Sequence, residues 1–242
     1  MKIVPQSVTL LDYQGSDLST VNAARVSFNK ESDWEYDIKH DGRYNEHLSD
    51  KDIKLINYLA KHNHWSPFAH NSLTFRIKAP IFVARQLVKH QVGGVWNEVS
   101  RRYVDEEPEF YLPTLWHKKP ENAKQGASEE VVNLTGFIWQ NSSDMFIKNR
   151  QYFDNVTDIC LWEYKRMIES GIAPEEARII LPLNTMTEWW WTGSLMFFAR
   201  VCKQRLDSHA QNATREVASL IAAAIPPEFS HSWKALMGQS TT

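Results

Sequence analysis

The sequence has few cysteines and lacks any long apolar run. Among 242 residues only Cys160 and Cys202 carry thiols, and they match neither a CxxC pair nor the spacing of a secreted disulfide framework. No segment approaches the roughly 20 consecutive apolar residues that span a membrane, and the N-terminal MKIVPQSVTLLDY lacks the apolar stretch of a signal peptide. We therefore expect reduced core cysteines and a cytoplasmic protein without a membrane partner.

An excess of either charge is also missing. Lys and Arg together number 27 and Asp and Glu 29, which gives a formal net charge of −2. So small a net charge argues against a general binder of nucleic acid or of membrane surfaces. Tryptophan, by contrast, is abundant, because ten in a chain of this length provide more flat apolar surface than a core needs. We expect some of them at interfaces or in ligand pockets.

Hydrophobic periodicity and turn residues predict a mixture of helices and strands. Leu73, Phe75 and Ile77 alternate with polar residues, which is typical of a half-buried strand. The predicted strands are 3–11, 73–77 and 187–192, and the predicted helices are 17–28, 50–62, 81–90, 143–170, 174–180, 194–206 and 209–224. Residues 29–46 and 114–140 are expected to be irregular. Because no repeat and no low-complexity linker divides the chain, we predict one α+β domain over 1–242.

One segment, Ala84 to Tyr103 (ARQLVKHQVGGVWNEVSRRY), concentrates positive charge around a glycine pair. Against a single acid, Glu98, it holds a set of basic residues: Arg85, Lys89, His90, Arg101 and Arg102. Guanidinium groups pair with phosphates through two parallel hydrogen bonds, and backbone N–H groups near glycines also favour anions. The segment predicts a site for an anionic ligand, and the alternative is a solvated helix and loop with incidental charges.

Three further motifs carry polar residues of interest. The histidines of KHNHWSPFAH (His62, His64 and His70) fit no zinc spacing, so we predict no metal site. RLDSHAQ contains Ser, His and Asp, but residues this close in one turn rarely point at one another, and no GxSxG elbow is present. Arg178 in EEARIILPLN would alone be an ordinary helix arginine.

Taken together and in order, these segments resemble the flavin-dependent thymidylate synthases. The family signature is Arg-His-Arg, seven residues and Ser, and this chain has Lys89-His90-Gln91, eight residues and Ser100. The resemblance covers most of the chain, through AARVSF, HWSPFAH, APIFVARQ, NEVSRRY, EFYLP, ARIILPLN and RLDSHAQ. It implies a central, mostly antiparallel sheet flanked by long helices, and a homotetramer whose active sites are shared between subunits.

The resemblance also implies a reaction, the reductive methylation of dUMP to dTMP. Methylenetetrahydrofolate would supply the carbon, reduced FAD the hydride, and NADPH the electrons that reduce the flavin again. The other type of thymidylate synthesis needs a cysteine nucleophile, and neither cysteine here has the polar neighbours of a thiolate. A route without an enzyme cysteine therefore agrees with the residues.

By the same resemblance, individual residues receive roles. Arg205 falls where an arginine polarises the uracil ring, and a permanent cation there would stabilise developing negative charge. The residues that fall where the family holds dUMP are Gln86, Lys89, Ser100, Arg101, Arg102 and Arg178. Those that fall where it binds FAD are Ser27, Ser66, Lys89, His90, Gln91, Glu98, Ser194 and Arg200.

The signature departs from the family pattern in three ways. Lys89 keeps the charge of an arginine but loses its bidentate geometry, Gln91 loses the charge, and one extra residue falls at Gly93-Gly94. Two alternatives to the implied reaction stay open. One is transfer of a different one-carbon unit, such as hydroxymethyl, to a pyrimidine nucleotide. The other is a non-catalytic module that binds nucleotide or RNA with its basic residues and tryptophans.

Overall fold

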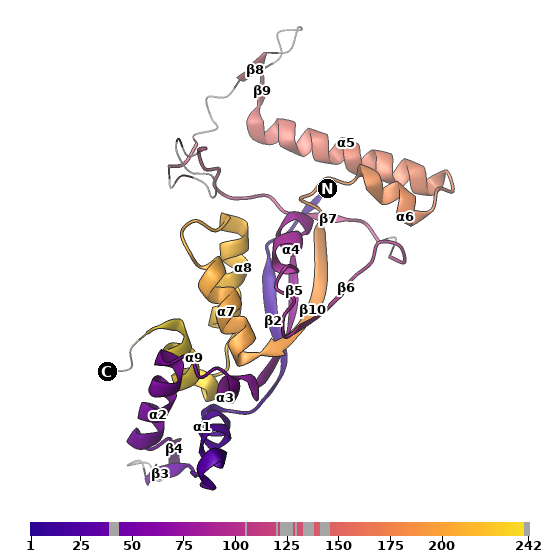
Figure 1. Ribbon diagram of the computed structural model, residues 1–242. Coiled ribbons are helices and arrows are strands. Elements are labelled where there is room, and N and C mark those ends of the chain that lie inside the picture. The colour runs from indigo at the N-terminus through magenta and orange to yellow at the C-terminus, as the bar shows by residue number, and fades with distance from the viewer. Residues whose placement is uncertain are drawn as a thin grey trace.

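A four-stranded antiparallel sheet lies at the centre of the protein (Figure 1). This computed structural model describes residues 1–38, 44–104, 106–119, 121, 128, 130–132, 138–140 and 146–239. The sheet has the order β2-β5-β10-β6, with β2 (Ser7–Gln14), β5 (Ser72–Pro80), β10 (Met186–Ser194) and β6 (Gly94–Glu98). Each pairing between neighbours is antiparallel, which confirms the predicted sheet type.

Alternating side chains determine which face of the sheet is buried. On β5 the predicted residues Leu73, Phe75 and Ile77 are fully buried, and so is Ala79, which continues the same alternation. On β10, Trp189 and Trp191 are buried, whereas Trp190 between them is 56% exposed. The ring of Trp96 on β6 stacks on that of Trp189, with 4.3 Å between the ring centroids. Part of the tryptophan excess therefore builds the core rather than an interface or a ligand pocket.

Helices pack against the sheet and extend the molecule at both ends (Figure 1). Those packed beside the sheet are α4 (Ile81–Leu87), α7 (Leu195–Arg205) and α8 (Asn212–Ala223). One end of the molecule holds α1 (Asp17–Arg25), α2 (Asp50–Lys61), α3 (Ser66–Ala69) and α9 (Ser230–Met237). From the other end project α5 (Asn149–Glu169) and α6 (Pro174–Ala177). The sheet thus connects a helical end to a projecting helical arm.

Side chains cap the helices that enclose the core. Ser194 Oγ accepts the backbone N–H of Phe197 at 3.1 Å and so caps α7. Asp17, only 2% exposed, accepts the backbone N–H groups of His231 and Ser232, both at 2.8 Å. Because Asp17 begins α1 and Ser232 lies in the first turn of α9, one carboxylate joins two helices that are far apart in the sequence.

Two stretches that we expected to be irregular contain hairpins. Within 29–46, β3 (Glu35–Ile38) pairs with β4 (Tyr44–His47). The end of the 114–140 stretch forms β8 (Ile138–Gln140), which pairs with β9 (Phe146–Lys148), and parts of that stretch lie outside the described residues. The helix predicted over 143–170 therefore begins later, at Asn149. At the N-terminus, β1 (Lys2–Ile3) and β7 (Glu109–Phe110) form a short parallel pair.

The helix predicted over 81–90 is also shorter than expected. It ends at Leu87, and a turn with a 3.0 Å hydrogen bond from His90 N to Leu87 O follows. The glycine pair ends the turn and begins β6, an edge strand that the sequence did not predict. Near the C-terminus, α8 begins at Asn212 rather than at 209, and α9 was not predicted.

Two glycines on adjacent strands make room for one aromatic ring. Gly94 on β6 faces Gly193 on β10, and the ring of Phe197 lies over both. A Cβ atom at Gly94 would lie 2.5 Å from Phe197 Cζ, and a Cβ atom at Gly193 would lie 2.3 Å from Phe197 Cδ1. Phe197 is 5% exposed and packs edge-on against Trp191, so its ring has little space into which it can move.

Gly193→Ala should therefore destabilise the protein. We expect a loss of roughly 1–3 kcal/mol in the free energy of unfolding, because the added methyl group overpacks a closed core. Urea unfolding followed by tryptophan fluorescence measures it. Combining the change with Phe197→Leu, which removes the clashing ring, should make the cost of the alanine smaller. A Gly193→Ala protein as stable as the wild type would show that the ring is free to move.

Candidate functional site

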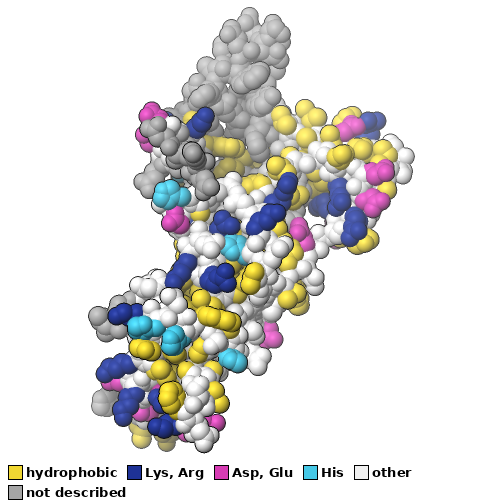
Figure 2. Space-filling model, viewed as in Figure 1, with side chains coloured by type: hydrophobic (Ala, Val, Ile, Leu, Met, Phe, Trp, Pro, Cys, Tyr) yellow, Lys and Arg dark blue, Asp and Glu magenta, His cyan; other side chains and the backbone are white. Residues whose placement is uncertain are grey.

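Exposed cations gather around the turn that joins α4 to β6. Figure 2 shows Lys and Arg side chains over the middle of the face that carries α4, α7 and α8. The exposed cations of α4, the turn and the near part of α7 include Arg85, Lys89 and Arg200. This part of the surface is suited to an anionic ligand, as the sequence predicted.

A small cleft lies between that turn and α7. Its volume is about 210 Å³, and its lining is Lys89, His90, Gln91, Val92, Phe197, Arg200, Val201 and Gln204. The predicted flavin-binding residues Lys89, His90, Gln91 and Arg200 therefore lie around one cleft, although the last is more than a hundred positions from the others. The cleft combines positive charge with an apolar wall.

Beside this cleft, His90 holds the side chain of Arg205. Arg205 Nε donates a hydrogen bond to His90 Nε2 at 3.0 Å. Because Nε2 accepts, the imidazole is neutral and carries its proton on Nδ1. Burial, together with the charges of Arg205 and Arg200, lowers the pKa of His90 to about 4. The ring is therefore neutral at pH 7, and the structure brings together two residues that the sequence predicted in separate motifs.

Gln86, the predicted nucleotide-binding residue on α4, is oriented by α8. The hydroxyl of Thr214, which is fully buried, donates to Gln86 Oε1 at 3.1 Å. The amide nitrogen of Gln86 then acts as a donor, and in this structure it contacts Gln211 Oε1. An amide fixed in this orientation offers N–H groups to an anionic oxygen. Sequence analysis missed Thr214, because nothing local indicates a contact across 128 positions.

A larger cavity of about 920 Å³ lies beside β5, β6 and β10. Three predicted site residues, Glu98, Arg101 and Arg178, line it. Arg101 Nη1 donates to the backbone oxygen of Glu106 at 2.8 Å, and Arg178 Nε donates to that of Glu175 at 3.1 Å. Both guanidinium groups are thus held by neutral carbonyl oxygens in these contacts, which leave their positive charge available to an anion.

The same cavity contains an ion pair that sequence analysis missed. Arg76 Nε on β5 donates to Glu188 Oε1 on β10 at 2.7 Å, and both residues line the cavity. Glu188 lies two positions from Trp190, the residue directly opposite Arg76. Residues that lie diagonally across two paired strands can interact. Comparing the polar residues of the two predicted strands in this way would have identified the ion pair.

Two more predicted residues, Ser100 and Arg102, pair with each other just after β6. Arg102 Nε donates to Ser100 Oγ at 3.1 Å. The guanidinium of Arg102 also lies 4.9 Å from the ring centroid of Tyr103. Arg102 and Tyr103 are both exposed, so a ligand can reach the guanidinium group of Arg102. Ser194, predicted to bind flavin, uses its hydroxyl to cap α7.

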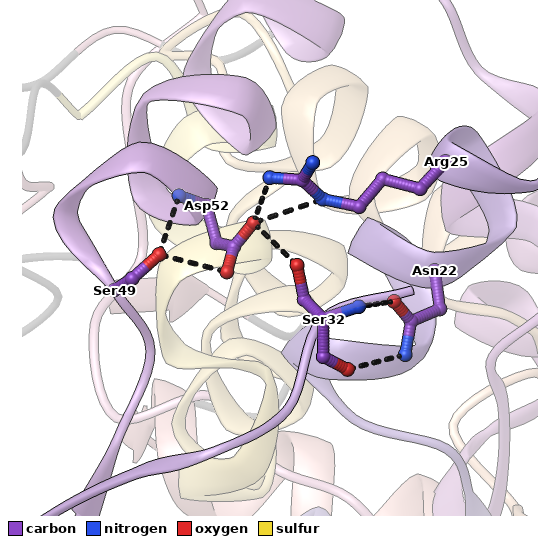
Figure 3. Close-up of polar contacts among 5 residues, drawn as sticks. All are labelled: Asn22, Arg25, Ser32, Ser49 and Asp52. Carbon is purple, nitrogen blue, oxygen red and sulfur yellow. Dashed lines mark hydrogen bonds and ion pairs between the residues drawn. The ribbon is translucent and has the colours of Figure 1, made fainter. Parts of the chain in front are cut away.

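The remaining predicted residues, Ser27 and Ser66, lie at the helical end of the molecule. Ser27 is in the 3₁₀ turn that follows α1, Ser66 begins α3, and both are exposed. Neither lines the cavities described above. A network centred on Asp52 holds the segment that carries Ser27, with Arg25 on one side of Ser27 and Ser32 on the other (Figure 3). Within a single chain, the predicted site residues therefore fall into three groups.

Metal-ligand clusters, membrane-length helices and reactive thiols would each indicate another chemistry in the described residues. No three His, Cys, Asp or Glu side chains in the described part of the chain gather as metal ligands would. No described helix is long and apolar enough to cross a membrane. Cys202 is fully buried, and burial raises the pKa of its thiol to about 12. Cys202 is therefore not a thiolate nucleophile at neutral pH.

A cationic cleft and a larger cavity of mixed charge, beside an antiparallel sheet, define an α+β protein with a candidate site for an anionic ligand. A family model described as "Thymidylate synthase complementing protein" (Thy1) matches residues 9–229. The chain is 33% identical to the flavin-dependent thymidylate synthase of Kosmotoga olearia and 35% identical to that of Thermotoga neapolitana, in each case over 89% of this chain and 83% of the relative. The chain belongs to the flavin-dependent thymidylate synthase family.

Solved structures show the same fold. The chain is similar to a UMP/dUMP methylase, PolB from Streptomyces cacaoi, in a crystal structure bound with 5-Br dUMP. The TM-score is 0.75 at 28% identity, over 98% of this chain and 97% of that one. A second structure of PolB, bound with 5-Br UMP, gives a TM-score of 0.72 at 25% identity, over 98% and 96% of the two chains. The predicted fold class is therefore confirmed.

Proposed function

We propose that the protein methylates dUMP to dTMP with a bound flavin. The match to flavin-dependent thymidylate synthases over 89% of the chain carries this proposal. The structural neighbour bound with 5-Br dUMP supports a pyrimidine nucleotide as substrate. Methylenetetrahydrofolate is the proposed carbon donor and NADPH the proposed reductant, and FAD carries the hydride chemistry that no side chain supplies.

The nucleotide is bound by residues from both cavities. Gln86 and Lys89 lie on the α4 side with Arg205, whereas Arg101 and Arg178 line the larger cavity. We propose that the two sets meet across subunit interfaces of a homotetramer, with Ser100 and Arg102 near the second set. Exposed apolar side chains on α5 support such contacts: Val156, Ile159 and Trp162, with 41%, 63% and 63% exposure.

The cleft beside α7 fits part of a flavin dinucleotide. Lys89 and Arg200 provide cations for a phosphate, Gln91 an amide, and Phe197 an apolar surface. Its volume of about 210 Å³ is below the roughly 300–1,000 Å³ of pockets that enclose a drug-sized ligand. The rest of the cofactor would contact the other predicted residues, Ser27, Ser66, Glu98 and Ser194, some of them on a partner subunit. When bound and reduced, the flavin supplies a hydride.

Arg205 acts on the uracil ring through its charge. A guanidinium beside the pyrimidine N3 and its adjoining carbonyl stabilises negative charge that develops on the ring. A guanidinium group carries a permanent positive charge in proteins. Its Nε is already used by His90, which leaves the two Nη groups for the base.

The proposal is tested by incubating the purified, FAD-loaded protein with dUMP, methylenetetrahydrofolate and NADPH. We expect dTMP, identified by mass, and no product when either co-substrate is omitted. A product heavier than dTMP by one oxygen atom would carry a hydroxymethyl group, and it would establish the alternative one-carbon transfer. A flavin-loaded protein that leaves dUMP unchanged would overturn the proposal, and tight, strongly salt-dependent RNA binding would then favour a binding module.

Methylation of UMP is a second candidate function. It is favoured by the structural neighbour that is a UMP/dUMP methylase and was solved with 5-Br UMP. Parallel assays with UMP and dUMP, compared by kcat/KM, separate the two substrates. Product from UMP at a comparable kcat/KM would establish it, and product from dUMP alone would exclude it.

Cys202→Ala should leave dTMP formation within about two-fold of the wild type, because the proposed route uses no enzyme thiol. Cys202 lies on the buried side of α7, and its Sγ is 3.6 Å from the backbone oxygen of Ala218. We expect only a small loss of stability, about 1 kcal/mol for removing one buried sulfur atom. Steady-state rates and thermal melting check both statements. A folded variant without activity would contradict the thiol-independent route.

A further inference from the structure

The guanidinium of Arg205 is anchored at one nitrogen by an uncharged acceptor. Arg205 Nε donates to His90 Nε2 at 3.0 Å. Within the described part of the chain, its two Nη groups have no hydrogen bond and no carboxylate partner. Arg25, which pairs with Asp52, and Arg76, which pairs with Glu188, differ in this respect. Arg205 is held in place without an ion pair.

The kind of anchor decides how much charge the guanidinium offers to a ligand. A carboxylate would hold Arg205 equally well, but its negative charge would offset much of the positive charge felt nearby. A neutral imidazole accepts one hydrogen bond and adds no net charge. His90 is half-buried, and among the described residues the charged groups that contact it or line the cleft beside it are cations: Arg205 and Arg200 on α7 and Lys89 in its own turn. These surroundings keep the imidazole unprotonated.

His90 is held rigidly enough to act as such an anchor. Its backbone N–H donates to Leu87 O at 3.0 Å, which ties the turn to the end of α4. α4 in turn packs against β5 and α8. Arg205 is the last residue of α7, so the contact joins a helix end to a turn that is tied to α4.

We propose that His90 is a positioning residue that fixes Arg205 through Nε while leaving its full charge and both Nη groups free for the uracil ring. This inference rests on the proposed function, in which Arg205 faces the base of dUMP. It assigns to the imidazole ring of His90 a role distinct from flavin contact. The neutrality of the anchor is its essential property, because an unpaired cation stabilises the negative charge on the ring more strongly than one whose charge a carboxylate offsets.

The matched pair His90→Gln and His90→Glu tests the idea, because the two side chains have nearly the same shape and reach. Gln keeps a neutral acceptor for Arg205 Nε, whereas Glu replaces it with a carboxylate. We expect kcat for dTMP formation to be at least about ten-fold lower in the Glu variant than in the Gln variant, with a smaller change in KM for dUMP. The His209→Gln and His209→Glu pair, at an exposed position after α7, controls for one added negative charge nearby.

A second measurement needs no turnover. 5-Bromo-dUMP is bound to each flavin-loaded protein and titrated with base, and its N3 ionisation is followed by ultraviolet difference spectra. Wild type and His90→Gln should lower the N3 pKa of the bound nucleotide relative to the free one. His90→Glu should abolish that shift. Thermal melting and the flavin spectrum show that the variants remain folded and loaded, and the titration decides where a variant has no measurable rate.

The outcomes separate this inference from the proposed function. A wild-type protein that makes no dTMP overturns the proposed function itself. If the wild type is active but the Gln and Glu variants share the same kcat and the same N3 shift, His90 has only a structural role and this inference is wrong. A Glu variant that is specifically slower and has lost the N3 shift supports it.

Discussion

Arg205→Ala is expected to lower kcat for dTMP formation by at least about 100-fold without unfolding the protein. Removal of one preorganised group that stabilises transition-state charge typically costs about 10²–10³ in kcat. Arg205 is half-buried at the end of α7, and the contact that it would lose is the one with His90. The core side of α7 is formed by apolar residues, so thermal stability should fall by only a few degrees. Stopped assays with product detection by mass measure the rate.

Two further variants make this prediction specific. Lys203→Ala removes an exposed cation from the same helix and should leave kcat within about two-fold of the wild type. Arg205→Lys keeps the charge but lacks an Nε donor for His90, so its rate should fall between those of the wild type and the alanine variant. An Arg205→Ala protein that retains wild-type turnover would show that the resemblance assigns the wrong arginine.

Strands in the buried sheet could be predicted from the sequence because burial imposes a period on them. Leu73, Phe75 and Ile77 follow it, and so do Trp189 and Trp191. The hairpin of β3 and β4 has no such signal, because nearly all of its side chains are exposed and neither face needs to be apolar. β6 was missed for a different reason. Its first residue, Gly94, belongs to a glycine pair that predicts a turn, and the need for glycine arises from Phe197, which is remote in sequence.

The location of the site was more predictable than its contacts. The residue types around Lys89 to Arg102 indicated an anion site, and the structure places several of them around a small cationic cleft and a larger cavity of mixed charge. The contact of His90 with Arg205 spans 115 positions, and that of Gln86 with Thr214 spans 128. No local pattern encodes such contacts, because they depend on how α7 and α8 pack against α4. The resemblance to a family predicted the roles of the site residues, whereas the contact of His90 with Arg205 could be seen only in the packed structure.

Asp52 is the centre of a polar network that connects α1, α2 and the segment between them (Figure 3). Asp52 is 3% exposed, and its carboxylate accepts hydrogen bonds from Arg25 Nε at 3.1 Å, Ser32 Oγ at 3.0 Å and Ser49 Oγ at 2.8 Å. Arg25 and Ser32 flank Ser27, so one carboxylate fixes both ends of that segment. The stability of the helical end and the placement of Ser27 therefore depend on the same group.

Asp52→Asn should destabilise the protein by roughly 2–4 kcal/mol at pH 7, because it leaves Arg25 without its anion and turns an amide toward donors that need an acceptor. Asp50→Asn is the matched control. Asp50 is an exposed acid in the same first turn of α2, and its loss should cost less than about 1 kcal/mol. Urea unfolding of the three proteins measures both values. Equal losses in the two variants would show that the network contributes nothing beyond helix-end charge.

The dependence on pH distinguishes an ionised Asp52 from a neutral hydrogen-bonding group. Burial alone would raise the pKa of Asp52, but hydrogen bonds from Arg25, Ser49 and Ser32 outweigh burial, so that its pKa lies below the ordinary value. A depressed carboxyl pKa means that the unfolded chain binds the proton first as the solution is acidified. The advantage of the wild type over Asp52→Asn should therefore be complete above about pH 5 and should shrink as the pH falls through about 4 and below. An advantage that stays constant down to about pH 3 would mean that the charge of Asp52 is not what stabilises this end of the molecule.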